Sequence, residues 1–335
     1  MPASGQDCLL CAGLVACLCF FAVLLLLVRA PARPLRSYGA AAAELPVRLT
    51  CLLRGVYNPS LVLDEGGGAW LAARDSPMRD GRSEVVLARG RVERLAAQPL
   101  RALPGLRGQV DARLFRFRGD LLAGAHEAGP AQAFSSTLLS IEQGRAAVLE
   151  LPEGAQEAQK NWIPIPHGED LYWVQSLSPF RLLRSQSFDG ALPPRLRCED
   201  VALAPLSRQL PRGARGSSAA CPVPRGRLAA WHLRLAPDAL AENLRGLGVG
   251  ELPDYLQGLV LLDEVPPFLP RASSAPFRFV GSTPEAQAAL GAGFHFLNGV
   301  AVAGARVFFC LGVADTSAAV VEADLDAVLG RLLPL

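Results

Sequence analysis

The amino-acid sequence predicts an all-β protein, a five-bladed β-propeller preceded by a single N-terminal transmembrane helix. Three observations support this fold class. From residue 47 onward the chain consists of short apolar runs, each about four to eight residues long, broken by Gly, Pro and Asp, as in strands joined by turns. A hairpin-like unit recurs along that region. Before it stands an uncharged apolar run, residues 9–28.

The recurring unit consists of a short polar motif, an apolar strand, a turn containing Gly, and a second apolar strand. It starts at or near Asn58, Asp111, Asn161, Ser218 and Phe296. The turn glycines are Gly67, Gly119, Gly168, Gly226 and Gly304. They lie about 50 to 80 residues apart, which suits one four-stranded blade per interval. A series of hairpins in a β-sandwich is the alternative, but such hairpins need not recur at blade-sized intervals.

The predicted domain order is a short tail (1–8), a transmembrane signal anchor (9–28), a stalk (29–46) and the propeller (47–335). A helix as long as the apolar run spans roughly 30 Å, the thickness of the hydrocarbon core of a bilayer. A cleaved signal peptide is the alternative for this segment. The run is longer than a usual signal-peptide core, and no basic residue precedes it.

The orientation of the predicted anchor stays open. Arg29, Arg33 and Arg36 follow the span, and the positive-inside rule would place that flank in the cytosol. By analogy with other single-span anchors, the opposite orientation, with the domain in the lumen, is the alternative. The predicted localisation is a single-pass membrane protein of the endomembrane system, in the Golgi or ER, with a lumenal domain.

Helices are expected at few places in the predicted propeller. Residues 324–333 and 237–247 are the best candidates, since long stretches with a period of 3.6 residues are nearly absent elsewhere.

Composition and motif content exclude several functional classes. The formal net charge is +2 and both signs are spread along the chain, which argues against a nucleic-acid partner. Cys51, Cys198, Cys221 and Cys310 lack the spacing of a zinc site and are expected as two disulfides or as buried thiols. No metal or organic cofactor is predicted, because the four histidines lack a metal-binding spacing and the sequence contains neither a Walker loop nor a Rossmann fingerprint. The oligomeric state is left open.

The repeat predicts where polar side chains gather. In a propeller the first strand of each blade lines the central channel, so the starts of these strands meet at one mouth. Asn58, Asp111, Asn161, Ser218 and Asn298 occupy equivalent places in the five units. Convergence of polar groups from distant parts of a chain is what a ligand site requires, and we therefore expect a binding site at that mouth.

The motifs also resemble those of a known family. YNPSLV, DARLFRFRGDLL, QKNWIPI followed by LYWVQSLSPFRLL, and FLNGVAVAGARVFFCLGVADTSAAVVEADLDAVL stand in the order found in the five-bladed mannoside phosphorylases and related β-mannosidases. The likeness covers roughly residues 47–333. It implies a glycan or glycoconjugate as substrate, with β-mannoside-like bonds cleaved with inversion by inorganic phosphate or by water. Inverting cleavage needs a general acid at the leaving oxygen.

The resemblance implies a role for Asp111 as that acid or its relay. The family carries a Glu-Asp-Pro-Arg motif at the start of the second blade, where this chain has Val110-Asp111-Ala112-Arg113. The Asp and the Arg are retained, while the Glu and the Pro are not. A neighbouring Glu would change the pKa of the Asp, and the Pro would restrict the backbone. Their loss leaves catalysis open, while binding is still expected.

The other expected site residues are cations, amides and one further acid. Arg74, Arg113 and Lys160, the only lysine in the sequence, are expected to bind phosphate or substrate oxygens. Asn58, Asn161 and Asn298 are expected to position the sugar, and Asp315 lies in the matching GVADT segment. Turn formation and surface ion pairing are the structural alternatives. Three aromatic residues are expected either to stack on a sugar or to pack in the core: Tyr172, Trp173 and Trp231.

We therefore predict a membrane-anchored, glycan-active propeller, a glycoside phosphorylase or hydrolase. Two alternatives remain. The first is a propeller that binds glycans, or accompanies a glycosyltransferase, without cleaving its ligand, which the altered Glu and Pro favour. The second is a protein-interaction propeller with a vestigial pocket.

Overall fold

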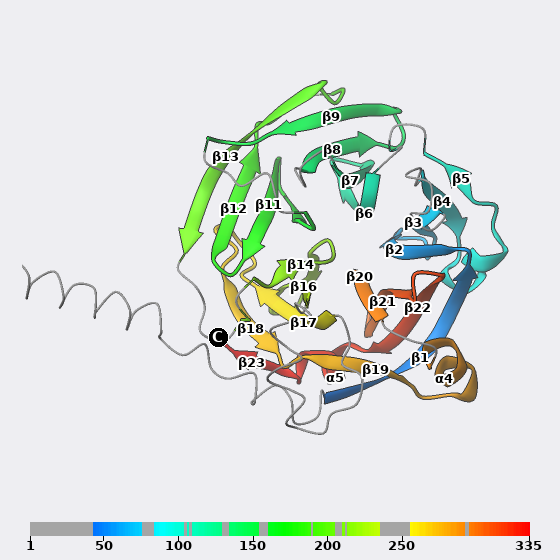
Figure 1. Ribbon diagram of the computed structural model, residues 1–335. Helices are drawn as coiled ribbons and strands as arrows, with labels where there is room; N and C mark the ends of the chain where they lie inside the picture. The colour runs from blue at the N-terminus through cyan, green and yellow to red at the C-terminus, as the bar shows by residue number, and fades with distance from the viewer. Residues whose placement is uncertain are drawn as a thin grey trace, which may run out of the picture.

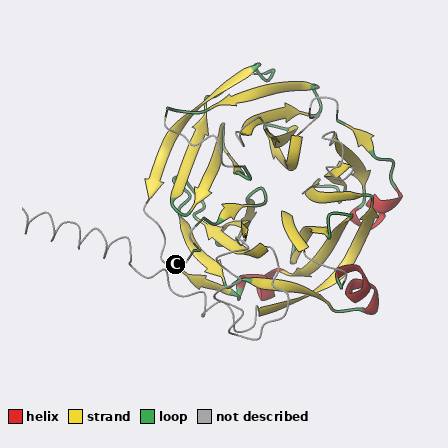
Figure 2. Cartoon of the chain, in the orientation of Figure 1, coloured by secondary structure: helices red, strands yellow, loops and turns green. Residues whose placement is uncertain are grey.

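The computed structural model describes residues 43–75, 84–103, 106, 109–128, 134–153, 160–188, 190–204, 210–211, 213–234, 255–291 and 295–335. Its strands are arranged radially around a central axis in a propeller-like fold, and its helices are few and short (Figures 1 and 2). The prediction of a mostly β protein is confirmed.

The strands form five groups that follow one another along the chain, and neighbouring strands within a group run mainly antiparallel. Group one holds β2 (Val56–Leu63), β3 (Ala69–Asp75), β4 (Glu84–Gly90) and β5 (Arg101–Ala102). Group two holds β6 (Gln109–Phe117), β7 (Asp120–Ala128), β8 (Phe134–Ser140) and β9 (Arg145–Glu150). Group three holds β10 (Ile163–His167), β11 (Asp170–Leu177), β12 (Phe180–Ser185) and β13 (Arg195–Ala204).

The last two groups are less regular. Group four begins with two short strands, β14 (Arg215–Gly216) and β15 (Cys221–Val223), which both pair with β16 (Gly226–Arg234). It continues through β17 (Tyr255–Leu262) and β18 (Pro270–Ser274) to the C-terminal strand β23 (Leu332–Pro334). Group five holds β20 (His295–Ala303), β21 (Arg306–Val313) and β22 (Ser317–Asp324).

Two pairings join strands that are distant in sequence. The first strand of the described chain, β1 (Ala43–Arg54), completes group five by pairing antiparallel with β22, and it also pairs parallel with β19 (Phe277–Gly281). This pairing joins the first described strand to a strand near the C-terminus and closes the ring (Figure 1). On the other side, β9 pairs parallel with β13, so groups two and three share one eight-stranded sheet.

Burial follows the distance of each strand from the axis. The middle strands are buried on both faces and read as continuous apolar runs, as in β21 with the sequence RVFFCLGV. The outer strand β13 instead alternates buried and exposed residues over its first half, because only one face packs on the core. The four described cysteines, Cys51, Cys198, Cys221 and Cys310, are free thiols.

The predicted hairpin turns are present. Gly67, Gly119, Gly168, Gly226 and Gly304 all have positive φ, the conformation that glycine adopts without strain. Gly226 has a second reason to be glycine, because a Cβ there would lie 2.2 Å from the carbonyl oxygen of Leu262.

The helices are short and capped. The predicted C-terminal helix forms as α5 (Leu325–Leu329), with the Asp324 side chain accepting a hydrogen bond from the Ala327 N–H. Helix α4 (Pro284–Leu290), capped by Thr283, and the 3₁₀ helix η2 (Val92–Ala97) were not expected. Residues 237–247 lie outside the described residues.

The predicted membrane localisation is corrected. No helix in the described part of the chain is long and apolar enough to cross a membrane. The seven residues of α4 span only about 10 Å, a third of what a bilayer requires. The predicted span (9–28) and stalk residues 29–42 lie outside the described residues, and residues 43–46 belong to β1. The prediction of a single-pass endomembrane protein is therefore withdrawn.

Candidate functional site

Three residues at the starts of the first strands share an unusual backbone conformation. Asn58, Asp111 and Asn161 have φ values of 50°, 57° and 70°, in the left-handed region that Asn and Asp tolerate better than other side chains. The register of the strand ladder shifts at Asn58, at Asp111 and again at Asn298. A bulge of this kind interrupts pairing and redirects the side chain, which explains why a polar residue recurs there.

The carboxylate of Asp111 is the meeting point of three groups. Asn58 Nδ2 of group one donates a hydrogen bond to Asp111 Oδ1 at 2.7 Å. Lys160, just before group three, places its Nζ 3.4 Å from Asp111 Oδ2. Arg113 Nη1 donates to the backbone oxygen of Asp111, and its Nη2 donates to Asn161 Oδ1 at 2.9 Å. The structure thus brings together five of the predicted residues.

Asp111 is ionised in this environment. The side chain is buried, and burial alone would raise its pKa, but Lys160, Arg113, the Asn58 hydrogen bond and Arg74 together hold the pKa well below its ordinary range. At neutral pH the group is therefore a hydrogen-bond acceptor with no proton to give. The role of Asp111 as an acid stays a prediction that requires some change in the site to raise this pKa.

Two buried guanidinium groups lie beside this carboxylate. Burial lowers the pKa of Arg113 to about 10, while Asp111 raises it, so that the side chain is charged at neutral pH. Arg74 lies over the ring of Tyr57, with its guanidinium carbon 5.2 Å from the ring centroid. Burial raises the pKa of Tyr57, Arg74 opposes that rise, and Asp111 and Asp315 add to it, so Arg74 and Asp315 both border the cluster.

The remaining predicted residues divide into two kinds. Asn298 is fully buried and donates through Nδ2 to the backbone oxygens of Asn58 and Pro59, at 2.8 and 3.2 Å, so it holds the bulge that carries Asn58. Ser218 is bound within its own group, where its hydroxyl accepts from the Ala230 N–H and donates to a backbone carbonyl. No hydrogen bond of the described residues connects Ser218 to the Asp111 cluster.

Buried polar atoms without a partner gather at this site. Of the seven such side-chain atoms in the described residues, four belong to the cluster: Asn58 Oδ1, Arg74 Nε, Arg113 Nε and Asn298 Oδ1. Leaving a buried polar group unpaired costs about 1–3 kcal/mol, so folded proteins rarely retain several in one place without a use for them.

Sequence reasoning missed a second ring of polar residues at the ends of the second strands. His126, Gln175 and His232 are buried there, on β7, β11 and β16. Burial is the largest cause that lowers the pKa of His126 and His232 to about 3, and the charge of Arg113 is the second. Both imidazole rings are therefore neutral at physiological pH. The sequence does contain a pattern that could have predicted this ring: Arg74, His126 and Gln175 each stand seven positions after the turn glycine of their unit.

Two other expectations concern aromatic rings and metals. Tyr172, Trp173 and Trp231 are at most 5% exposed and pack in the hydrophobic core, so none presents a ring face to a sugar. Among the described residues, no three His, Cys, Asp or Glu side chains stand close enough to hold a metal ion.

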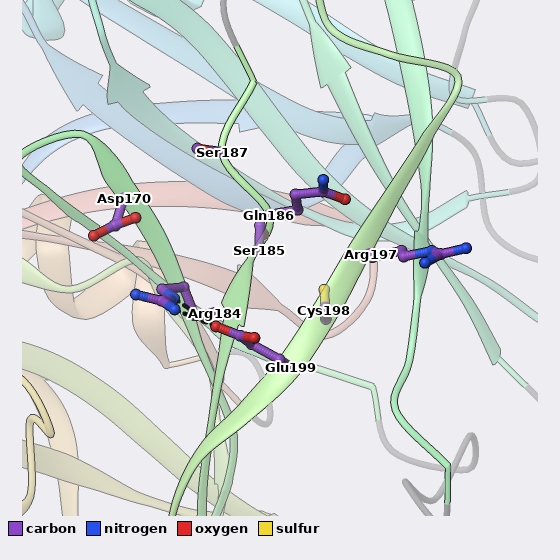
Figure 3. Close-up of a pocket in the computed structure, with 8 residues that line it drawn as sticks. All are labelled: Asp170, Arg184, Ser185, Gln186, Ser187, Arg197, Cys198 and Glu199. Atoms are coloured by element: carbon purple, nitrogen blue, oxygen red, sulfur yellow. Dashed lines mark hydrogen bonds and ion pairs between the residues drawn. The ribbon is translucent and has the colours of Figure 1, made fainter.

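A hollow of about 530 Å³ lies away from these residues, at the other end of the β10–β11 hairpin (Figure 3). Its lining residues include Asp170, Arg184, Arg197 and Glu199, and none of the predicted site residues. Arg184 donates a hydrogen bond to Glu199, and Arg197 lies 3.7 Å from Glu150, so both arginines of this hollow already have an acidic partner.

Comparison with known proteins bears on the fold. No protein-family model and no curated protein matches the sequence. Solved structures do match: the β-1,2-mannobiose phosphorylase of Listeria innocua is 13% identical, with a TM-score of 0.52 over 84% of this chain and 92% of that chain. A mannose phosphorylase of Leishmania mexicana, solved with a phosphate ion, is 13% identical, with a TM-score of 0.51 over 90% and 95%. The chain has the fold of the mannoside phosphorylases.

A third match extends the comparison to hydrolysis. The structure of a GH130-family protein, from a study of glycoside hydrolases that target β-1,2-mannosidic linkages in Candida mannan, is 12% identical. Its TM-score is 0.55 over 82% of this chain and 85% of that chain. The resemblance predicted from motif order is confirmed, and the chain is a divergent relative in fold. At such identities the likeness concerns the fold alone, and the roles of the site residues stay predictions.

Proposed function

We propose that this chain cleaves β-mannoside-like glycosidic bonds with inversion, and that inorganic phosphate is its nucleophile. In this proposal the five strand groups are the five blades of a propeller that occupies residues 47–335. The site lies at the mouth where the first strands of the blades begin. The glycan-active neighbours of the same fold support the substrate class.

One observation carries the proposal: a buried, ionised carboxylate surrounded by three cations from different parts of the chain. Lys160, Arg113 and Arg74 all act on Asp111, and Asp315 acts on the neighbouring Tyr57. Counting both acids, the cluster carries an excess of one positive charge. Such an excess of positive charge favours an anion as ligand, and one guanidinium group can donate hydrogen bonds to two oxygens of a phosphate at once.

Binding of phosphate would also raise the pKa of Asp111, so that this carboxyl group could carry a proton. The cations that now lower its pKa would be shared with the bound anion, so the pKa would rise and a proton could reside on the carboxyl group. Asp111 would then give that proton to the leaving oxygen as an oxygen of phosphate forms its bond to the anomeric carbon. Monohydrogen phosphate brings the replacement proton, so atoms and charges balance.

Water is the less favoured nucleophile. Inverting hydrolysis needs a second carboxylate that removes a proton from water, at roughly 6.5–9.5 Å from the acid. Asp315 at the border of the cluster is the candidate for such a base, but the excess of positive charge at the site favours phosphate over water. Asn58 and Asn298 each keep an amide oxygen without a partner, which supports a role in holding sugar hydroxyl groups.

The test is the release of mannose 1-phosphate from β-1,2-mannobiose and inorganic phosphate by the purified protein. Asp111→Asn keeps an acceptor for Asn58 but cannot carry the proton, and we expect a loss of about 10²- to 10⁴-fold in kcat. Glu142→Gln is the matched control, since Glu142 is an exposed carboxylate of the same group paired with Arg116. Turnover unaffected by Asp111→Asn would remove this residue from the mechanism.

A glycan-binding protein without turnover is the second candidate. The ionised state of Asp111 favours it, as do Val110 and Ala112 where related motifs have Glu and Pro. Calorimetry with β-1,2-mannobiose separates the two candidates. Binding of the disaccharide with no product after long incubation with phosphate would select the binding protein.

A further inference from the structure

A row of hydrogen bonds leads from the Asp111 cluster into group four. Arg113 Nη2 donates to Asn161 Oδ1 at 2.9 Å, and Asn161 Nδ2 lies 3.4 Å from His232 Nε2. On the far side of the ring, His232 Nδ1 forms a short contact with Ser217 Oγ. All four side chains are buried, and together they connect groups two, three and four.

The direction of every bond in this row follows from Arg113. A guanidinium group can only donate, so the atom that faces it must be the amide oxygen of Asn161. The amide nitrogen of Asn161 therefore points at His232 Nε2, and this nitrogen must accept. A neutral imidazole that accepts at Nε2 carries its hydrogen on Nδ1, which donates to Ser217 Oγ.

The surroundings hold the imidazole ring in this arrangement. Phe296 of group five and Tyr255 of group four meet its plane edge-on, with ring centroids at 4.8 and 5.9 Å. The residue is only 4% exposed. Burial, then Arg113, lowers the pKa of His232 to about 3, and Asp111 raises it, so the ring stays neutral at physiological pH.

We propose that His232 is a positioning residue whose Nδ1–H tautomer fixes the amide of Asn161 and, through it, the guanidinium of Arg113. His232 acts through Asn161 and need not touch the ligand. If the imidazole carried its hydrogen on Nε2, two donors would face each other and the Asn161 amide would turn over. Its nitrogen would then face Arg113, which would move away from Asp111.

The first test reads the tautomer in the ligand-free protein and does not depend on the proposed function. Two-dimensional ¹⁵N–¹H spectra of the imidazole rings distinguish a protonated from an unprotonated ring nitrogen. The chain has four histidines, so His→Gln variants assign the signals. We expect Nδ1 of His232 to be protonated and Nε2 unprotonated between pH 6 and 8. A protonated Nε2 would overturn the proposal.

The second test uses a matched pair of substitutions. His232→Gln places an amide oxygen near the former Nε2 and keeps the acceptor for Asn161. His232→Asn instead keeps a donor for Ser217 near the former Nδ1 and loses that acceptor. Asn is smaller than Gln and leaves the larger cavity, so urea unfolding of both variants measures the packing loss separately from the effect on Arg113. The positioning role predicts that only His232→Asn disturbs Arg113.

Two measurements report on Arg113. In NMR spectra, we expect its Nη hydrogens to be protected from exchange in wild type and in His232→Gln, and to exchange freely in His232→Asn. Where the proposed function holds, calorimetry with inorganic phosphate should give about tenfold weaker binding for His232→Asn and less than threefold for His232→Gln. Equal effects of the two variants in the NMR measurement would overturn the proposal. Absence of phosphate binding by wild type would instead count against the proposed function alone.

Ser217→Ala is a third variant, for the case that both substitutions at His232 prevent folding. It removes the acceptor of the Nδ1 hydrogen and leaves the ring in place. The proposal predicts a growing share of the Nε2–H tautomer and a loosened Arg113. A spectrum of His232 identical to that of wild type would contradict it.

Discussion

The ion pair between Lys160 and Asp111 makes the strongest energetic prediction. At the observed separation of 3.4 Å, two unit charges attract by about 5 kcal/mol at an effective dielectric constant of about 20, and by about 1 kcal/mol at that of water. The Lys160 side chain is 33% exposed and that of Asp111 4%, so the true value lies between these limits. We expect a coupling free energy of about 2 kcal/mol.

A double-mutant cycle measures this coupling. Lys160→Met keeps the length of the side chain and removes the charge, and Asp111→Asn keeps the shape and an acceptor for Asn58. Urea unfolding at pH 7 of wild type, both single variants and the double variant gives the coupling free energy. Lys160→Met alone should destabilise the protein, because a buried carboxylate loses a cation that stabilises it.

An exposed ion pair provides the control for this cycle. Arg195 lies 2.9 Å from Glu150, yet its side chain is 78% exposed. The same cycle with Arg195→Met and Glu150→Gln should give less than about 0.5 kcal/mol. Equal coupling in the two cycles would refute the reasoning, because burial would then have no influence on the pair at Asp111.

Three further predictions concern the framework of the site. Gly312→Ala would place a Cβ 2.4 Å from Asn58 Oδ1, so urea unfolding should show a free energy of unfolding lower by about 1–3 kcal/mol. Calorimetry should show a loss of phosphate binding by the same variant, and unchanged binding would contradict this. Asn298→Ala should lower stability by about 1–3 kcal/mol in the same assay, because two buried backbone oxygens lose their donor, and no loss would mean that water replaces it. Burial keeps the pKa of His126 and His232 near 3, below the value of about 6.5 in the unfolded chain. As the pH drops below 6.5, the free energy of unfolding should therefore fall by about 1.4 kcal/mol per pH unit for each of the two histidines. His126→Gln should remove one of these two contributions, and an unchanged slope would refute this.

The repeat in the sequence was enough to predict the mostly β fold and the meeting of three polar side chains from different units. Asn58, Asp111 and Asn161 stand at equivalent places before their turn glycines, and equivalent places in such a fold converge. Ser218 occupies the same place in its unit, yet its hydroxyl binds the backbone of its own group. The place of a residue in the repeat could not distinguish a side chain that contacts a neighbouring group from one that forms a hydrogen bond with the backbone of its own group.

Other features depend on the packing of the whole ring. The parallel pairing of β9 with β13 joins strands whose own patterns do not name their partner. His232 contributes through a tautomer that only the contacts with Asn161 and Ser217 define. The charge state of Asp111 results from several cations that lie far apart in the sequence, so its lowered pKa could not be read from neighbouring residues.

The most direct test of the central claim is the formation of mannose 1-phosphate from β-1,2-mannobiose, with and without inorganic phosphate, by wild type and by Asp111→Asn. The proposed site predicts product only when phosphate is present, with inversion at the anomeric carbon, and a loss of about 10²- to 10⁴-fold in the variant. Free mannose released at the same rate without phosphate would contradict phosphate as the nucleophile. Equal rates for the two proteins would contradict the central role of Asp111.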